Sequence, residues 1–80
     1  MLPPVESSRL ATLWTLAWDQ DLLRCVVYRT EGGMRLAIES DEAVVHSEGF
    51  ELQPRALRRA RALGDALRRR GWRDASAAAP

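Results

Sequence analysis

The sequence lacks lysine and asparagine altogether, and it contains a single cysteine, Cys25. One cysteine excludes an internal disulfide and any metal site built from several cysteine ligands. Cys25 lies in the apolar run LLRCVVY, which predicts a small buried hydrophobic residue in a reducing cytoplasm. A reactive thiol is the alternative interpretation.

Long apolar runs are also missing. No stretch approaches the ~20 apolar residues of a membrane-spanning helix. The first residues, MLPPVESS, lack the basic start and the long apolar core of a signal peptide. We therefore expect a cytoplasmic protein without a membrane partner.

What the sequence contains is typical of one small globular domain. Its 80 residues are 46% hydrophobic and 29% charged, which separates it from disordered chains. Ordering a chain of this size costs on the order of 100 kcal/mol, and apolar burial roughly balances that cost. Because small domains often gain stability by pairing, the length alone favours a homodimer.

Charge is distributed unevenly along the chain. Residues 1–52 carry nine acidic residues and four arginines, a net charge of −5, whereas residues 53–80 carry eight arginines and two acidic residues, a net charge of +6. The two halves can neutralise each other, within one chain or between two. The alternative is a basic face that binds an anionic partner.

A helix over residues 54–71 is the clearest element. Pro54 suits the first turn, where its missing N–H costs nothing, and Gly71 suits the left-handed position after the last turn. Gly64 would let the helix approach a sheet closely, although glycine costs ~1 kcal/mol against alanine. The residues that share the apolar side at a 3.6-residue period are Ala56, Leu57, Ala60, Leu63, Gly64 and Leu67.

The chain before the helix predicts strands separated by short polar turns. Tryptophan and threonine favour a strand in the first segment, where a helix is the alternative. The fourth strand is expected at a sheet edge, with a kink at residues 48–50 and Phe50 between sheet and helix. The predicted strands cover residues 9–18, 22–30, 34–39 and 43–47.

Together these elements predict an α+β fold, an antiparallel β-meander of three to four strands packed against one C-terminal α-helix. Residues 1–8 form a flexible lead, residues 9–73 a single domain, and residues 74–80 a disordered Ala-rich tail. One helix of about 25 Å covers one sheet face only. Leftover aliphatic residues and tryptophans on the other face are then expected to recruit another chain. The candidate interface residues are Trp14, Trp18 and Tyr28.

No spacing supports catalysis, and we expect no enzyme activity, no metal and no cofactor. His46 is the only histidine, and nothing joins it to Cys25 or to a serine and a carboxylate, as nucleophilic catalysis requires. We expect His46 to be a surface residue or part of a cross-strand pair. Asp41, Glu42, His46 and Glu48 could ligate a metal, but a solvated turn is the simpler interpretation.

The arginines on the outer side of the helix are the best candidates for an anionic partner. They could contact the phosphates of single-stranded DNA or RNA while sheet aromatics stack on bases. Strands followed by a helix is also the broad layout of some dimeric single-strand DNA-binding proteins. An acidic sheet argues against this interpretation, because it would repel the backbone from the aromatics Trp14, Trp18 and Tyr28. The helix candidates are Arg55, Arg58, Arg59 and Arg69.

The spacing as a whole resembles a set of short uncharacterised bacterial proteins. These share W-x-L, a Cys-bearing strand, a Gly turn and an A-L-x-x-A-x-x-L helix that ends in G-W, here over roughly residues 13–72. The resemblance implies a strand meander with one helix and brings no established activity. We therefore expect a non-catalytic binding or adaptor protein that acts through protein–protein contacts as a homodimer. The alternative is a nucleic-acid-binding protein that uses the arginine-rich helix and the sheet aromatics.

Overall fold

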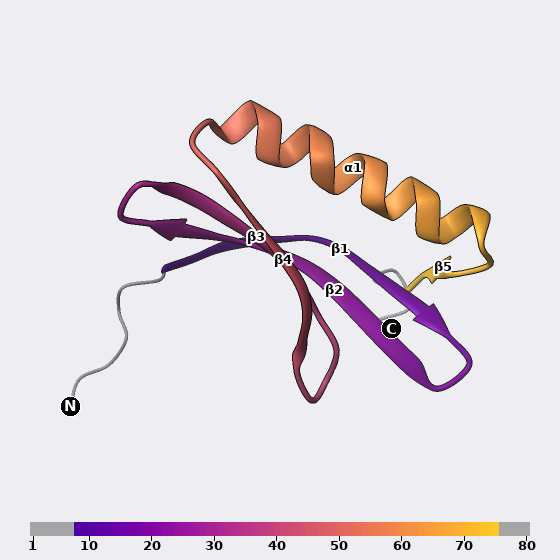
Figure 1. The fold of residues 1–80 in the computed structure, drawn as a ribbon. Coiled ribbons are helices and arrows are strands. Elements are labelled where there is room, and N and C mark those ends of the chain that lie inside the picture. Colours follow the sequence, from indigo (N-terminus) through magenta and orange to yellow (C-terminus); the bar gives the residue numbers. More distant parts are fainter. Residues whose placement is uncertain (1–7, 76–80) are drawn as a thin grey trace.

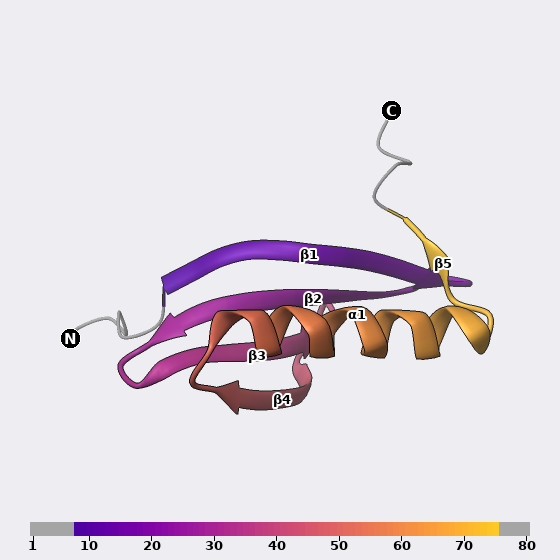
Figure 2. The ribbon, with the colours of Figure 1, turned by 90° about the horizontal axis from the view of Figure 1, so that it is seen from above.

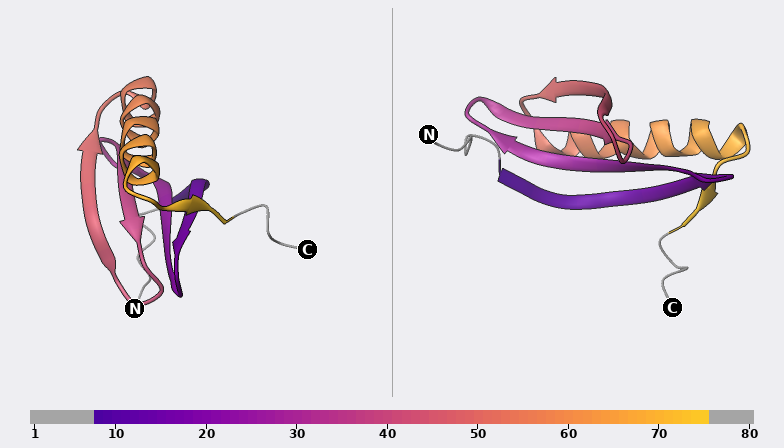
Figure 3. Two further views of the ribbon diagram at one scale, coloured as in Figure 1. Left: turned by 90° about the vertical axis from the view of Figure 1, so that its right-hand side faces the viewer. Right: turned by 90° about the horizontal axis from the view of Figure 1, so that it is seen from below.

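The computed structural model describes residues 8–75, and predictions for residues 1–7 and 76–80 lie outside that range. An antiparallel sheet packs against one C-terminal helix, which confirms the predicted α+β fold (Figure 1). The order in the sheet is β4-β3-β2-β1-β5, with β4 and β5 at opposite margins (Figure 3). The elements are β1 (Ser8–Trp18), β2 (Asp21–Thr30), β3 (Gly33–Glu39), β4 (Val44–Phe50), α1 (Gln53–Arg69) and β5 (Arg73–Asp74).

The first segment is a strand, so the helical alternative for it is wrong. A two-residue turn joins β1 to β2, and Trp18 pairs with Asp21 across it. Asp19 takes φ 58° in this turn, a left-handed conformation that aspartate tolerates better than most residues. The Asp–Gln–Asp sequence therefore ends β1 as predicted.

Strand β4 lies at the sheet edge as predicted, but it is longer than predicted. The kink expected at residues 48–50 is wrong, because Glu48 pairs with Leu36 and Phe50 pairs with Met34 in the β3–β4 ladder. Pairing with β3 overrides the low strand propensity of Gly49. Phe50 packs against the core from this position, in agreement with its predicted place between sheet and helix.

Strand β5 was not predicted. Asp74 pairs with Leu16 and Arg73 with Ala17, and the Ala75 N–H donates to the Thr15 carbonyl at 2.9 Å. Asp74, which the sequence assigns to the tail, is thus part of the sheet. Two residues carry too little periodicity to indicate a strand, and only their neighbour β1 defines it.

Helix α1 runs along one face of the sheet (Figures 1 and 2). Cys25 lies in the core between them with no solvent exposure, which confirms the predicted buried residue. Burial raises the pKa of its thiol from 9.0 to about 11, because the thiolate would lose its solvation. The buried core cluster consists of Trp14, Leu16, Cys25, Val27, Leu36, Ile38 and Ala60.

Small residues on α1 bring the helix close to the sheet at Trp14. The Trp14 Nε1–H donates a hydrogen bond to the Ala60 carbonyl at 2.8 Å. A Cβ at Gly64 would lie 2.8 Å from Trp14 Nε1, so only glycine leaves room for the indole. The predicted close approach at Gly64 is confirmed. Leu57, by contrast, lies at the margin of the apolar stripe and is 40% exposed.

The C-terminal end of α1 also follows the prediction. Gly71 takes φ 115°, its N–H donates to the Arg68 carbonyl at 3.0 Å, and the Trp72 N–H donates to the Leu67 carbonyl at 3.1 Å. This pair of bonds is the Schellman motif, which satisfies carbonyls at a helix end. It turns Trp72 back toward the sheet. Among the described residues, no helix is both long enough and apolar enough to cross a membrane.

The sheet face that α1 leaves uncovered is mainly polar. Its central residues Val26 and Ala37 are 0% and 2% exposed, so neighbouring side chains on that face already cover them. Trp14 and Trp18 alternate with the residues of this face and lie on the α1 side. The expectation of tryptophans on the uncovered face is therefore wrong. Cross-strand pairing places Arg9, Thr12, Thr15, Arg24, Tyr28, Arg35, Glu39 and Ser47 there.

Candidate functional site

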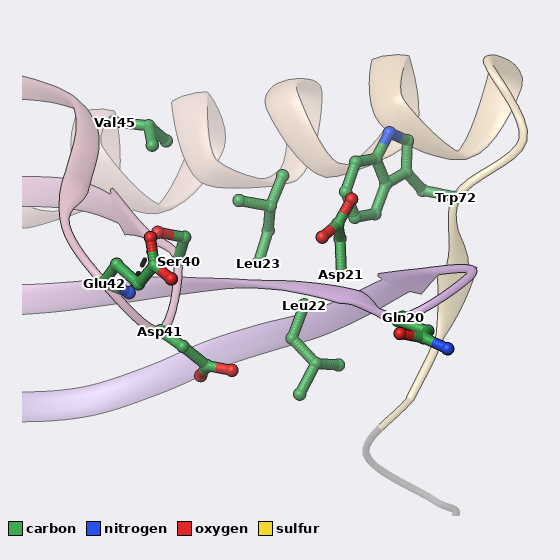
Figure 4. A pocket seen from close by; sticks show the side chains of 9 residues that line it. All are labelled: Gln20, Asp21, Leu22, Leu23, Ser40, Asp41, Glu42, Val45 and Trp72. Carbon is green, nitrogen blue, oxygen red and sulfur yellow. Dashed lines mark hydrogen bonds between the residues drawn. The ribbon is translucent and has the colours of Figure 1, made fainter.

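A hollow of about 530 Å³ lies where the β1–β2 and β3–β4 turns approach the segment that follows α1 (Figure 4). In Figure 4, Asp21, Leu23 and Trp72 project to the α1 side of the ribbon, whereas Leu22 projects to the other side. The hollow thus combines apolar side chains with carboxylates. Its lining consists of Gln20, Asp21, Leu22, Leu23, Ser40, Asp41, Glu42, Val45 and Trp72.

The β3–β4 turn forms one wall and is held by its own polar side chains. The Ser40 Oγ accepts hydrogen bonds from the N–H groups of Glu42 and Ala43, at 3.2 and 3.1 Å, and the Ser40 N–H donates to the Ala43 carbonyl at 2.8 Å. Arg24 on β2 donates to Asp41 at 3.2 Å and ties the turn to the sheet. These bonds fix the position from which Glu42 lines the hollow.

Trp72 forms the opposite wall. The Schellman motif fixes its backbone, and its ring meets Trp18 edge-to-face, with centroids 5.6 Å apart and planes at 71°. Trp72 also packs against the core. Trp18 remains 48% exposed. The Trp72 ring gives the hollow an apolar wall beside the carboxylates, and Trp18 packs against this ring.

The chemistry of the hollow suits a side chain with an apolar stem and a cationic end. Val45, Leu23 and Trp72 offer apolar contact, and Asp21 and Glu42 offer carboxylates. Among the ion pairs of the described residues, none involves Asp21 or Glu42, whereas Asp41 is paired with Arg24. Arginine and lysine have this combination of a hydrocarbon stem and a charged head.

The sequence did not predict this hollow. Asp21, Glu42, Val45 and Trp72 come from different segments, and the sequence indicates only that the two acids lie in or beside turns. The shared feature that could have pointed to it is that both polar turns are acidic and lie at ends of hairpins. Their approach to Trp72 depends on the direction in which α1 crosses the sheet.

The predicted arginine site on α1 is only partly assembled. Arg55, Arg58 and Arg59 line a shallow hollow of about 300 Å³ on the outer side of α1. Arg69 lies ten residues beyond Arg59, which is about 15 Å along a helix. Arg59 is already bound to Glu48 of the same chain. Its Nε donates to both Glu48 carboxylate oxygens at 3.0 and 3.1 Å, and its Nη2 donates to Oε2 at 3.0 Å.

Arg59 and Glu48 show that part of the charge asymmetry is neutralised between helix and sheet. The Arg59 guanidinium holds the pKa of Glu48 below its usual range, and the contact with His46 acts in the same direction. Glu48 raises the pKa of Arg59 in turn. None of the ion pairs among residues 8–75 involves Arg55, Arg58 or Arg69, so these three arginines keep their charge available to a partner.

The three aromatic candidates do not share a surface. Trp14 is buried in the core and Trp18 packs on Trp72, both on the α1 side of the sheet. Tyr28 lies on the opposite face, where its hydroxyl donates to Glu39. That hydrogen bond raises the pKa of the Tyr28 phenol. A stacking platform made of Trp14, Trp18 and Tyr28 together is therefore excluded.

His46 is an exposed residue of the edge strand, in agreement with its predicted surface position. Its Nε2 lies 2.6 Å from a carboxylate oxygen of Glu48 on the same strand. Asp41, a further metal-ligand candidate, is bound to Arg24. Within the described part of the chain, no group of three or more histidine, cysteine, aspartate and glutamate side chains could hold a metal ion.

Comparison with known proteins finds no matching family model, no matching curated protein and no matching solved structure. The resemblance to short bacterial proteins stays a prediction. The geometry of the hollow, the arginines and the sheet edge must therefore support any functional proposal.

Proposed function

We propose that the protein is a non-catalytic binding protein that acts through protein–protein contacts as a homodimer. The hollow between the two hairpin turns and Trp72 carries this proposal. Two exposed apolar side chains lie in or beside it. Val45 lines the hollow and is 57% exposed, and Trp18 is 48% exposed and packs on Trp72, which also lines the hollow. Exposed apolar residues that lie together beside polar groups are typical of protein interaction sites.

The partner segment carries an arginine or a lysine next to an apolar residue. Its cationic head would meet Asp21 and Glu42 at the rim, and its apolar part would lie on Val45 and Trp72. Both carboxylates lack an ion pair among the described residues, so binding displaces no internal partner. A charge-assisted hydrogen bond to a carboxylate is stronger than a neutral one and gives the site its preference for basic segments.

A fluorescence titration tests this function. The probe is a capped peptide of alternating arginine and leucine, and the control is the same peptide with glutamate in place of arginine. We expect the basic peptide to change the tryptophan emission saturably and the acidic peptide to leave it unchanged, because Trp72 lines the hollow.

Two valines provide a matched pair of variants. Val44 and Val45 are both 57% exposed, but only Val45 lines the hollow. Val45→Arg should abolish binding of the basic peptide, since it places a cation in the hollow, whereas Val44→Arg should keep it. Equal binding by the wild type and Val45→Arg would contradict the proposed site.

A second candidate function is nucleic-acid binding through the outer side of α1. The observation that favours it is the absence of Arg55, Arg58 and Arg69 from the ion pairs of the described residues. A fluorescent single-stranded oligonucleotide tests it. Affinity that falls steeply with salt and is lost in Arg55→Glu/Arg58→Glu would favour this function, because phosphate contacts release counterions. The homodimeric protein-binding proposal expects no such binding.

A further inference from the structure

We infer that β4 is the homodimer interface: β4 of one chain pairs antiparallel with β4 of a second copy, about a two-fold axis at Ser47. The inference rests on the proposed homodimer and specifies its contact. The two four-stranded meanders then form one continuous sheet with both α1 helices on the same face.

The open edge of β4 is the first observation behind this inference. The sheet ends at β4, and among residues 8–75 no strand pairs with its outer side, which leaves backbone groups along Val44–Phe50 ready to pair. Val44 and Val45 are each 57% exposed at its start. The strand contains no proline, a residue with which many proteins block such edges.

The opposite margin of the sheet is less suitable. Strand β5 covers β1 at Leu16 and Ala17, and the pairing of β1 with β2 is irregular at two places, between Arg9 and Ala11 and between Thr12 and Trp14. Bulges of this kind twist an edge and discourage further pairing. The β3–β4 ladder has one such irregularity, between Ile38 and Glu39 at the start of β4, and it is regular from His46 to Phe50. Of the two margins, this regular part of β4 is therefore the better template.

Charge complementarity selects the register. With the axis at Ser47, residues equally distant from it in the regular part of β4 oppose each other, so His46 faces Glu48 of the second copy. An axis at His46 would oppose two histidines, and an axis at Glu48 would oppose two carboxylates, which is unfavourable. Of these three registers, only the one with its axis at Ser47 pairs the histidine with a carboxylate.

His46 and Glu48 both lie on the α1 side of the sheet, as this pairing requires. His46 and Glu48 contact each other within one chain at 2.6 Å, and Arg59 of α1 holds Glu48 there. Directly opposed residues in an antiparallel pair have Cβ atoms about 4.5–5.5 Å apart. Each Glu48 would then lie near its own Arg59 and near two imidazoles, one from each chain.

Cysteine cross-linking tests the axis. Ser47→Cys places two cysteines opposite each other at the axis, within the span of about 4.4–6.8 Å between Cα atoms that a disulfide bridges. We expect oxidation to convert most of this variant to a covalent dimer on non-reducing electrophoresis. Native Cys25 is fully buried and should not contribute.

Gly49→Cys is the matched control. It lies on the same strand and face, but its two copies would be about 13 Å apart along the strands. It should not cross-link. A second variant, His46→Glu, opposes two pairs of carboxylates and should weaken dimerisation about tenfold.

The outcomes separate the interface from the function. If light scattering shows a dimer but Ser47→Cys cross-links no better than Gly49→Cys, the β4 interface is overturned while the homodimer stands. A wild-type chain that stays monomeric overturns both. Cross-linking at Ser47 alone, together with a weakened His46→Glu dimer, supports the interface.

Discussion

At the scale of single residues, Trp14, Ala60 and Gly64 decide how close the helix comes to the sheet. The indole N–H uses the Ala60 carbonyl as its acceptor, and the missing Cβ of Gly64 gives the ring its space. Sequence periodicity predicted that Gly64 faces the sheet. It could not predict which side chain fills the space, because Trp14 is fifty residues away in the chain.

Gly64→Ala is predicted to destabilise the protein by about 1–3 kcal/mol, since the added methyl overpacks the indole. This predicted loss is the net effect, after the ~1 kcal/mol that alanine gains in helix propensity. Chemical denaturation measures the difference. In a Trp14→Phe background the same substitution should cost less or stabilise. A more stable Gly64→Ala variant of the wild type would show that the indole moves aside freely.

Cys25 is predicted to be unreactive in the folded protein. Its burial and its raised pKa of about 11 leave almost no accessible thiolate at pH 8. Because the folded pKa lies above the unfolded one, folding stability also falls as the pH rises above about 9. A thiol reagent should react at pH 8 only after denaturation. Rapid labelling of the native protein would contradict this and revive the reactive-thiol interpretation.

At the scale of elements, local pattern predicted α1 and the first three strands, while non-local pairing decided the rest. The end of α1 follows from Gly71, whose positive φ only glycine adopts easily. The extension of β4 through Gly49 follows from the β3 ladder, and β5 exists because Thr15, Leu16 and Ala17 offer it a partner. The hollow depends on three elements together, so no single segment indicates it.

Glu48 connects β4 to α1, and its substitution should have a pH-dependent effect. Its pKa is lowered by Arg59 and then by His46, so its contribution to stability is present above the pKa of the unfolded state and is lost as the pH falls below it. Glu48→Gln should therefore destabilise the protein at pH 7. The difference should shrink below about pH 4.3, where an unfolded glutamate takes up its proton.

Thermal unfolding of both proteins across this pH range checks the prediction. Glu51→Gln is a suitable control, because Glu51 is exposed and takes part in none of the ion pairs of the described residues. A constant difference between the wild type and Glu48→Gln at all pH values would show that the ionised carboxylate is not the stabilising group.

At the scale of the whole molecule, the proposed partner contacts lie on a different surface from the one that the sequence indicated. The uncovered face carries arginines, threonines and a tyrosine, and its apolar centre at Val26 and Ala37 is already covered. Of the large apolar residues that are exposed, Trp18, Val44 and Val45 lie beside the hollow or at the start of β4, while Leu10, Leu52 and Leu57 lie elsewhere. We therefore place the partner contacts at one margin of the sheet rather than across its face.

The central claim is that this chain acts as a homodimer, and the mass of the purified protein in solution tests it most directly. Size-exclusion chromatography with light scattering should give about 18 kDa, twice the 9.0 kDa of one chain. Dilution should shift this mass toward that of the monomer. A constant mass of 9.0 kDa up to the highest soluble concentration would contradict the account.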